Sequence, residues 1–499
     1  MPISVNTPQV KLALVGVSRD CFPIDLTRTR LGKLTECCEN VGLDVYSCNT
    51  IIENEGDTLA ALAEVADAGA NSAVIYLGNF GPEGPLSIFA EHFDGPVMAC
   101  AAAEESKDTL VGGRGDAYCG MLNASYSFGL RNVPVYIPQM PVGLPDELAA
   151  KIKHFATVAR IIIGVLNLKI FAFGPRPQDF YACNAPIKPL YDMGVEVMEN
   201  SELDLWDLYN AVDEEDPAIA VVAKDMADEL GEGNTYPDLL PKLARFELAL
   251  LRFCEENLGS RSFGVFADKC WPAFEKAFGF VPCYVNSRLA LRGIPVACEV
   301  DMYGALSEYF CQLASDNPAT LLDINNTVPT DMLGGVDLKG ATTEDLFMGF
   351  HCGNTPSSCM KNCSMKYQLI MNRLIEDPSN APDITRGTLD GQIKPGPTTF
   401  FRLQGNAESQ LVSYVCEGNI LDIDPMSFGG IGVFAIPNFA RFYRHVLIGK
   451  RFPHHGAVAF NHCGKALFDA VKFLGVDDIN VPLTSSMRYQ GENPFDILC

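Results

Sequence analysis

The sequence predicts an α/β protein, with two doubly wound parallel-sheet domains followed by a mostly antiparallel β domain. In the first two-thirds of the chain, short apolar runs alternate with segments of helical periodicity, which is typical of parallel sheets covered by helices. After Asp331 the pattern changes to short strands separated by Gly and Pro, which is typical of an antiparallel sheet. We expect domains at residues 1–168, 169–326 and 327–499.

In the first domain, apolar runs and helical segments follow one another closely. The expected strands are 10–17, 44–48, 72–80 and 96–100, and the expected helices are 31–43, 58–70 and 115–130. Ligands of such sheets bind at the carboxyl ends of the strands. Arg19 and Asn79 follow two of these ends, so we predict both as substrate contacts. Surface ion pairing is the alternative for Arg19.

A long helix predicted at 145–166 leads into the second domain, where the alternation begins again. The expected elements are a strand within 169–180, a helix at 187–194, a strand at 195–199 and helices through 238–259. In the third domain, Gly- and Pro-rich strands are expected within 385–405, 409–421 and 430–437, with a terminal helix near 464–474.

Charge and hydropathy exclude several classes of partner. The formal net charge of −25 argues against nucleic acid, which requires a basic surface, and against anionic membranes. Solubility is the simplest reason for the acidic composition. The most apolar window is 158–173, and Arg160, Asn167 and Lys169 interrupt it, so it predicts a buried helix and strand instead of a membrane span. The N-terminal residues lack the pattern of a signal peptide, and we expect a cytoplasmic protein.

The 18 cysteines are numerous for a cytoplasmic protein, in which thiols are expected instead of disulfides. Cys352, Cys359 and Cys363 form the tightest group. Their spacing lacks the C-x2-C pairs of a zinc ribbon and the closer spacing of an iron–sulfur site. Buried thiols are therefore the favoured interpretation, and a cysteine metal site is the alternative.

Two carboxylates stand where apolar runs end. Glu299 follows IPVAC and precedes a helical segment, and Asp323 ends the run ATLL. Asp301 either points the same way as Glu299 or caps the helix. If the two runs are neighbouring strands, both acids face one cleft. Together with a histidine imidazole, the two carboxylates then form a mixed oxygen and nitrogen ligand set for a metal ion. A solvated acid near a helix start is the alternative for Glu299.

Three of the seven histidines fall within nine residues, at His454, His455 and His462. His351 ends another apolar run. A single histidine is more often structural than ligating, but the cluster and the two strand-end acids raise the probability of a metal site. Strand alternation allows only one of His454 and His455 to face the cleft.

Four motifs in order resemble the L-fucose isomerase and L-arabinose isomerase superfamily of ketol isomerases. They are ACEVDMYGAL around Glu299, LLDINN around Asp323, MGFHCGN around His351 and PHHGAVAFNHCGKAL around His455. Weaker similarities are GPRPQDF, CWPAF and DGQIKPGPTTFFRL. The three-domain layout agrees with that superfamily, and the resemblance covers nearly the whole chain.

The resemblance implies that Glu299, Asp323 and His455 bind one divalent ion, typically Mn²⁺. It selects His455 over His454, which we then expect to face away from the site. His351 matches a position that ligates the metal or lines the site, and we predict His351 and His462 as substrate contacts. The resemblance also implies a homo-oligomer, a trimer or hexamer, in which residues of the N-terminal domain contribute to a neighbouring subunit's site.

The implied reaction is aldose–ketose isomerisation through an enediol or enediolate, with Glu299 and Asp323 sharing the proton transfers. The expected substrate is a deoxy-hexose, pentose or modified hexose, similar to L-fucose or D-arabinose or including sulfoquinovose. The sequence contains no nucleotide fingerprint, so no redox cofactor is expected. The alternatives are a non-catalytic sugar-binding protein on the same scaffold and another metal-enolate enzyme, such as an aldolase or epimerase.

Overall fold

A computed structural model describes residues 6–183, 185–380 and 383–495 of the chain. It contains two compact units, an N-terminal unit at Pro8–Ile163 and a larger unit from Gly164 onward that also includes the residues up to Thr7. The predicted fold class is confirmed, because two parallel sheets with helices and one mostly antiparallel sheet are present. The domain boundaries proposed at 168 and 326 stay predictions.

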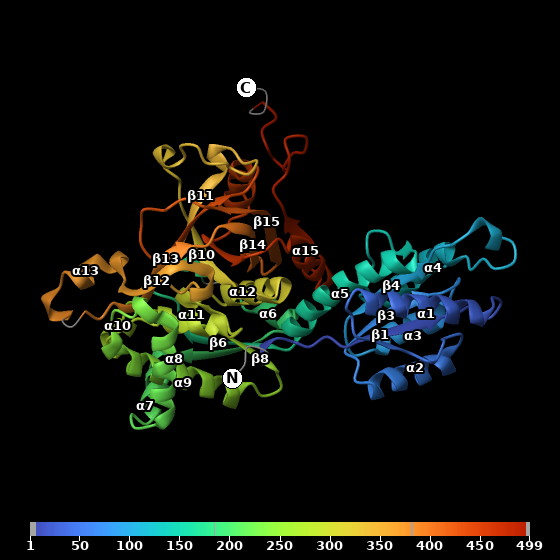
Figure 1. Cartoon of the computed structure of the whole chain (residues 1–499), viewed down its shortest axis with the longest axis horizontal. Helices are drawn as coiled ribbons and strands as arrows, with labels where there is room; N and C mark the ends of the chain where they lie inside the picture. The colour runs from blue at the N-terminus through green and yellow to red at the C-terminus, as the bar shows by residue number, and fades with distance from the viewer. Residues whose placement is uncertain (1–5, 184, 381–382, 496–499) are drawn as a thin grey trace. The chain divides into compact units, whose positions relative to one another are not determined.

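The N-terminal unit is built on a five-stranded parallel sheet in the order β2-β1-β3-β4-β5 (Figure 1). Its strands are β1 (Leu12–Val17), β2 (Val45–Ser47), β3 (Ser72–Leu77), β4 (Val97–Ala102) and β5 (Val142–Gly143). Its helices are α1 (Ile24–Asn40), α2 (Glu55–Asp67), α3 (Glu83–His92), α4 (Ala117–Arg131) and α5 (Pro145–Leu166). All residues of β1, β3 and β4 are buried, as continuous apolar runs in a sheet covered on both faces should be.

The predicted elements of this unit are present, but α1 begins earlier than predicted, and α3 and β5 were not predicted. The first helix begins at Ile24, seven residues before the predicted start, because polar residues at its beginning weaken the apolar periodicity. The sequence analysis did not identify α3, whose first turn contains Gly84 and Pro85. Both residues favour turns, which hides a short helix from pattern reading.

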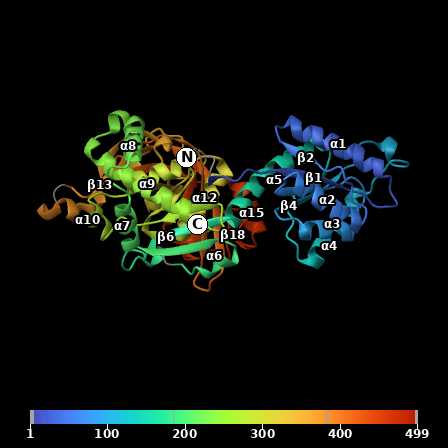
Figure 2. The ribbon, with the colours of Figure 1, turned by 90° about the horizontal axis from the view of Figure 1, so that it is seen from below.

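The larger unit contains a four-stranded parallel sheet in the order β7-β6-β8-β9. Its strands are β6 (Leu168–Gly174), β7 (Glu196–Ser201), β8 (Phe263–Ala267) and β9 (Val296–Ala297). The associated helices are α6 (Lys188–Asp192), α7 (Glu202–Ala211), α8 (Pro217–Leu230), α9 (Leu240–Asn257), α10 (Phe274–Phe278), α11 (Cys283–Leu291) and α12 (Met302–Ser315). Helix α9 packs against both α7 and α8, and α7 contacts β6 and β7 (Figures 1 and 2).

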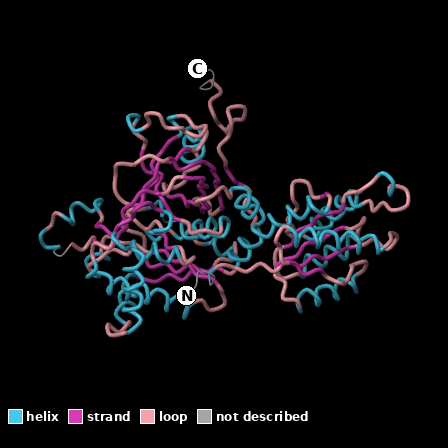
Figure 3. The backbone as a smooth tube through the Cα atoms, viewed as in Figure 1, coloured by secondary structure: helices cyan, strands magenta, loops and turns pink. Residues whose placement is uncertain are grey.

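The second sheet of the larger unit has nine strands, ordered β12-β13-β16-β11-β10-β17-β14-β15-β18. Figure 3 shows the strands of the larger unit in magenta among its cyan helices. Because β15 also pairs with β16, the strands β16-β11-β10-β17-β14-β15 close into a barrel-like ring. The strands are β10 (Thr320–Asn326), β11 (Leu346–His351), β12 (Met360–Tyr367), β13 (Arg386–Ile393), β14 (Gly396–Gly405), β15 (Leu411–Leu421), β16 (Gly430–Ala435), β17 (His455–Ala459) and β18 (Asp478–Asn480). Short helices α13 (Asn372–Ile375) and α14 (Phe439–Phe442), a π-helix (Tyr443–Ile448) and α15 (Gly464–Phe473) complete the unit.

Helix α12 joins the two sheets of the larger unit. It is buried at every position from Tyr303 to Ser315 and packs against β8 on one side and β14 and β17 on the other. Burial on every face places α12 in the interior of the larger unit. Its start, next to Asp301, therefore lies deep in the unit.

Strand β10 belongs to the nine-stranded sheet, whereas β9 is the edge of the four-stranded sheet. The expectation that Glu299 and Asp323 follow neighbouring strands is therefore wrong, although the two carboxylates do meet. Among the described residues, no helix combines the length and apolar character needed to cross a membrane.

The close approach of α4 to the loop after β3 requires glycine at position 120. A Cβ atom on Gly120 would lie 1.9 Å from the backbone oxygen of Phe80. We expect Gly120→Ala to lower the free energy of unfolding by about 1–3 kcal/mol, because backbone must shift to admit the methyl group. Urea unfolding followed by circular dichroism measures this change.

The matched control is Gly32→Ala in α1, where a Cβ atom meets nothing within 4 Å. This helical substitution should be neutral or stabilise the protein by up to about 1 kcal/mol. Equal unfolding curves for the two variants would contradict the packing described here.

Candidate active site

Four ionisable side chains from three segments of the larger unit converge on one point. Glu299 lies in a short turn after β9, Asp323 lies within β10, and His454 and His455 stand at the start of β17. Strands β10 and β17 are antiparallel, and Asp323 lies directly opposite His455. Directly opposed residues project from the same face of a sheet, so the pairing brings this acid and this imidazole together.

The turn that presents Glu299 is conformationally strained. Glu299 has φ of 63° and Val300 has φ of 57°, so two consecutive non-glycine residues adopt the left-handed region. A β-branched residue with positive φ is a genuine outlier, and such strain concentrates at functional sites. The strained turn directs the carboxylate of Glu299 toward the nine-stranded sheet instead of along the axis of α12.

Both histidines face the two carboxylates. His455 Nε2 lies 3.3 Å from Glu299 Oε2 and 3.3 Å from Asp323 Oδ1. His454 Nε2 lies 3.6 Å from Asp323 Oδ1 and 3.9 Å from Glu299 Oε2. The expectation that His454 faces away is therefore wrong. Strand β17 begins at His455, so the alternation of a regular strand does not extend to His454.

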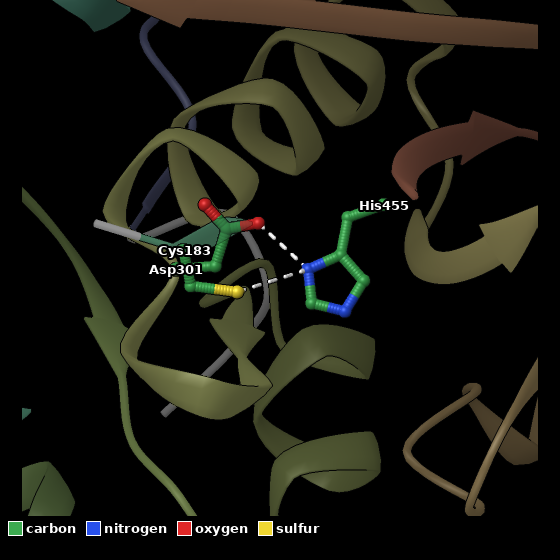
Figure 4. A group of neighbouring side chains, drawn as sticks. All are labelled: Cys183, Asp301 and His455. Atoms are coloured by element: carbon green, nitrogen blue, oxygen red, sulfur yellow. Dashed lines mark hydrogen bonds and ion pairs between the residues drawn. The ribbon is translucent and has the colours of Figure 1, made fainter. Parts of the chain in front are cut away.

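A buried ion pair holds the imidazole of His455 on its Nδ1 side. Asp301 Oδ2 lies 2.8 Å from His455 Nδ1, and both Asp301 oxygens accept hydrogen bonds from Arg402, at 2.6 and 2.8 Å. Figure 4 shows the Asp301 carboxylate and the Cys183 thiol on the same side of the His455 ring. Because Nδ1 donates to Asp301, the Nε2 atom of neutral His455 carries the lone pair.

Asp301 also caps helix α12, since its Oδ1 accepts from the Gly304 N–H at 2.8 Å. A Cβ atom on Gly304 would lie 2.6 Å from Asp301 Oδ2, so glycine leaves room for this carboxylate. The sequence analysis offered capping and orientation toward the site as alternatives for Asp301, and the structure shows both.

The electrostatics of the cluster favour a cation beside the carboxylates. Burial opposes ionisation of Asp323, but the adjacent His455 imidazole and the other histidines nearby lower its pKa to about 2. Burial likewise opposes the charge of His455, yet the Nδ1 hydrogen bond to Asp301 and the nearby Asp323 carboxylate raise its pKa well above the usual range. Burial, assisted by the adjacent His455, lowers the pKa of His454 to about 4. His454 is thus neutral near neutral pH.

The residues present fit one divalent cation on the Nε2 side of His455. That nitrogen is buried and has no hydrogen-bond partner, although two carboxylate oxygens lie near it. Carboxylate oxygen and imidazole nitrogen form a donor set suited to Mn²⁺ and similar ions. On the Nδ1 side, Cys183, Asp301 and His455 also approach one another, but Arg402 already occupies both Asp301 oxygens and carries positive charge. That side does not fit a cation.

His351 lies at the end of β11 and is buried beside the cluster. One of its ligand atoms lies within 4.8 Å of ligand atoms of Asp323 and His455. Its Nδ1 accepts the Cys352 backbone N–H at 3.0 Å, which places the proton of neutral His351 on Nε2. In this tautomer His351 is suited to donate a hydrogen bond to a substrate oxygen.

The other predicted substrate contacts belong to other segments of the chain. Asn79 is buried in the N-terminal unit, where its side chain bonds the Arg19 backbone N–H and the Ser18 hydroxyl, each at 2.8 Å. Arg19 lines a cavity of about 480 Å³ in the same unit. His462 is exposed at the opposite end of β17, and its Nε2 lies 2.8 Å from the Gly418 carbonyl oxygen. The substrate roles of these three residues stay predictions.

The cysteines of the described residues are free thiols, as predicted. Cys352 does not group with Cys359 and Cys363. It packs instead against a buried cluster that contains Cys270, Cys283 and Cys298.

Two family models match separate parts of this chain. Residues 13–166 match the family model "Fucose/sulfoquinovose isomerase, N-terminal domain", and residues 349–480 match "L-fucose isomerase, C-terminal domain". The chain belongs to the fucose/sulfoquinovose isomerase family. The predicted membership of this superfamily of ketol isomerases is thereby confirmed.

Several members named sulfoquinovose isomerase are similar to this chain. The protein of Priestia megaterium is 22% identical over 480 residues, which cover 93% of this chain and 97% of that protein. The protein of Alkalicoccus urumqiensis is 26% identical over 305 residues, which cover 58% of this chain and 60% of that protein. The protein of a Clostridium species is 28% identical over 195 residues, which cover 37% of this chain and 42% of that protein.

Asp301 should control cation affinity without touching the cation. We expect Asp301→Asn to weaken binding of Mn²⁺ by about 10- to 100-fold, because the amide no longer fixes the proton on His455 Nδ1. Isothermal titration calorimetry measures the affinity, and thermal unfolding of the metal-free protein monitors the fold.

The control is Asp345→Asn, another buried carboxylate, which accepts from the Ala440 backbone N–H at 3.0 Å. Its cation affinity should equal that of the parent protein. Unchanged affinity in a folded Asp301→Asn variant would show that the ion pair does not orient His455.

Proposed function

We propose that this protein is a metal-dependent aldose–ketose isomerase that binds one Mn²⁺ through Glu299, Asp323 and His455. One observation supports this proposal above all others. Two carboxylate oxygens face a buried imidazole nitrogen that has no hydrogen-bond partner. Membership of the fucose/sulfoquinovose isomerase family agrees with it.

The chemistry requires a proton to move between C1 and C2 of an open-chain sugar. Mn²⁺, when bound, supplies Lewis-acid stabilisation of the negative charge that develops on the sugar oxygens. Glu299 and Asp323 together provide the proton transfers, one at carbon and one at oxygen, through an enediol or enediolate. Asp301 and Arg402 keep the His455 ring fixed, so the two acids retain their separation during the reaction.

His454 has a separate role in this proposal. It is neutral near neutral pH and its side chain is 33% exposed, so it is accessible to a substrate hydroxyl. Phe180 packs edge-on against His454 with ring centroids 5.3 Å apart, and Trp271 contacts Phe180 in turn. These aromatic rings limit water beside the reacting carbons, which strengthens the electrostatic interactions of the site.

We propose a sulfonated hexose as the substrate, because relatives along nearly the whole chain are named sulfoquinovose isomerase. Neutral deoxy-hexoses and pentoses similar to L-fucose and D-arabinose are the other members of the proposed class. A sulfonate requires charge-assisted donors.

We further propose a homo-oligomer, a trimer or hexamer, in which Arg19 and Asn79 complete the site of a neighbouring copy.

A screen of aldoses with added Mn²⁺ tests the function. L-fucose, D-arabinose, L-arabinose and a sulfonated hexose are incubated with the protein, and ketose formation is followed by NMR. We expect ketose from at least one sugar, no activity after dialysis against a chelator, and recovery when Mn²⁺ returns. Binding without turnover of any sugar would indicate a sugar-binding protein, and carbon–carbon cleavage products would indicate an aldolase.

Substitutions test the roles of the two principal residues. Glu299→Gln should lower kcat by about 10²- to 10⁴-fold, because the amide cannot transfer protons. His455→Ala should lose both Mn²⁺ affinity and activity while the protein remains folded. His92→Ala, at an exposed histidine of the N-terminal unit, is the control and should retain the parent rate. A near-parent rate in His455→Ala would disprove the site assignment.

A further inference from the structure

The outer face of α4 is uncharged up to Arg131, which ends the helix and pairs with Glu91 at 2.7 Å. Residues 117–130 contain no Asp, Glu, Lys or Arg, in a chain of which 20% is charged. Four large side chains, which we call the α4 ridge, stand on this face at intervals of four residues. They are Tyr118, Leu122, Tyr126 and Leu130, and they are 65–68% exposed. Single exposed apolar residues are common, but a continuous apolar row on a surface helix marks an interaction site.

The ridge is not needed to attach α4 to its own unit. The inner face of the helix is buried independently through Ala117, Gly120, Met121, Ala124, Ser127 and Phe128. Helix α4 packs by this face against α3 and the parallel sheet. An ordinary surface helix pairs such an inner face with a charged outer face, and α4 does not.

The same face of α4 also contains a groove into which such a row of large side chains fits. Ser125 and Gly129 form the adjacent row of small residues, which we call the α4 groove. A Cβ atom on Gly129 would meet nothing within 4 Å, so the space above it is open. Ridges formed by residues four apart pack into such grooves with the helices crossing at about −50°. Two α4 helices related by a twofold axis are therefore complementary to each other.

We infer that α4 is a contact surface between two copies of this chain. Each copy carries a formal charge of −25, so two copies repel one another across most of their surfaces. An uncharged face lets them approach without opposing like charges. A basic partner would instead be recognised by carboxylates, which this face lacks. Tyrosine is enriched and Lys, Glu and Asp are depleted at the centres of protein interfaces.

The area of the ridge is consistent with this partner. Two tyrosines and two leucines, each about two-thirds exposed, present on the order of 500 Å² of accessible surface per copy. A symmetric pair thus buries about 1,000 Å² before the groove and flanking residues are included, which reaches the size of a small specific interface. The inference does not depend on the isomerase proposal, because assembly is measured without substrate.

Sedimentation velocity of the full chain at micromolar concentration tests the contact. We expect the parent protein to sediment at a multiple of its chain mass of 54.3 kDa. The double variant Leu122→Glu, Tyr126→Glu should sediment as a smaller species, with self-association weakened at least tenfold. The matched control is Leu59→Glu on α2, which changes a 66% exposed leucine of the same unit and should leave the mass unchanged.

A second variant separates a specific contact from general stickiness. Gly129→Trp fills the groove where the fold leaves open space, so its thermal unfolding should match the parent. If the groove of one copy receives the α4 ridge of another, Gly129→Trp should weaken assembly. If α4 associates only through non-specific apolar contact, the added indole should strengthen assembly. A monomeric parent, an unchanged mass in the double glutamate variant, or stronger assembly of Gly129→Trp would each overturn the inference.

Discussion

The candidate site depends on the orientation of one buried imidazole. Arg402 neutralises Asp301, Asp301 accepts the Nδ1 proton of His455, and Nε2 is left facing two carboxylates. Without Arg402, the Asp301 charge would be buried and uncompensated, at a cost of several kcal/mol. Without Asp301, no carboxylate would fix the proton of His455 on Nδ1. The lone pair would then not be held on Nε2, the side where Glu299 and Asp323 lie. The buried ion pair therefore determines the polarity of the whole cluster.

The surrounding elements position the residues that contact this imidazole. The pairing of β10 with β17 sets Asp323 opposite His455, and the strained turn after β9 brings Glu299 from the other sheet. Helix α12 lies between the two sheets and begins at Asp301, so the residue that caps the helix is also the one that orients the imidazole. A shift of α12 would consequently move the cap and the site together, which links the packing of the core to the chemistry.

Much of the fold was predictable because its signals are local. Fully buried strands such as β1 and β3 are continuous apolar runs, and helices such as α5 have a clear period. Glu299 and Asp323 were found because each ends an apolar run and lies in a motif that resembles the isomerase superfamily. Which sheet a strand joins is not a local property, so β10 was misplaced. His454 was misjudged because alternation was applied one residue beyond the strand. Arg402, a single charge within an apolar strand, required a partner that only the folded chain supplies.

We propose that the cation binds on the Nε2 side of His455. Crystals grown with Mn²⁺ and measured at the manganese absorption edge locate the ion directly through its anomalous signal. We expect one peak in the larger unit, bonded to His455 Nε2 and to carboxylate oxygens of Glu299 and Asp323, with the Asp301–Arg402 ion pair intact. A peak beside Cys183 on the Nδ1 side, or an ion that avoids His455, would contradict it.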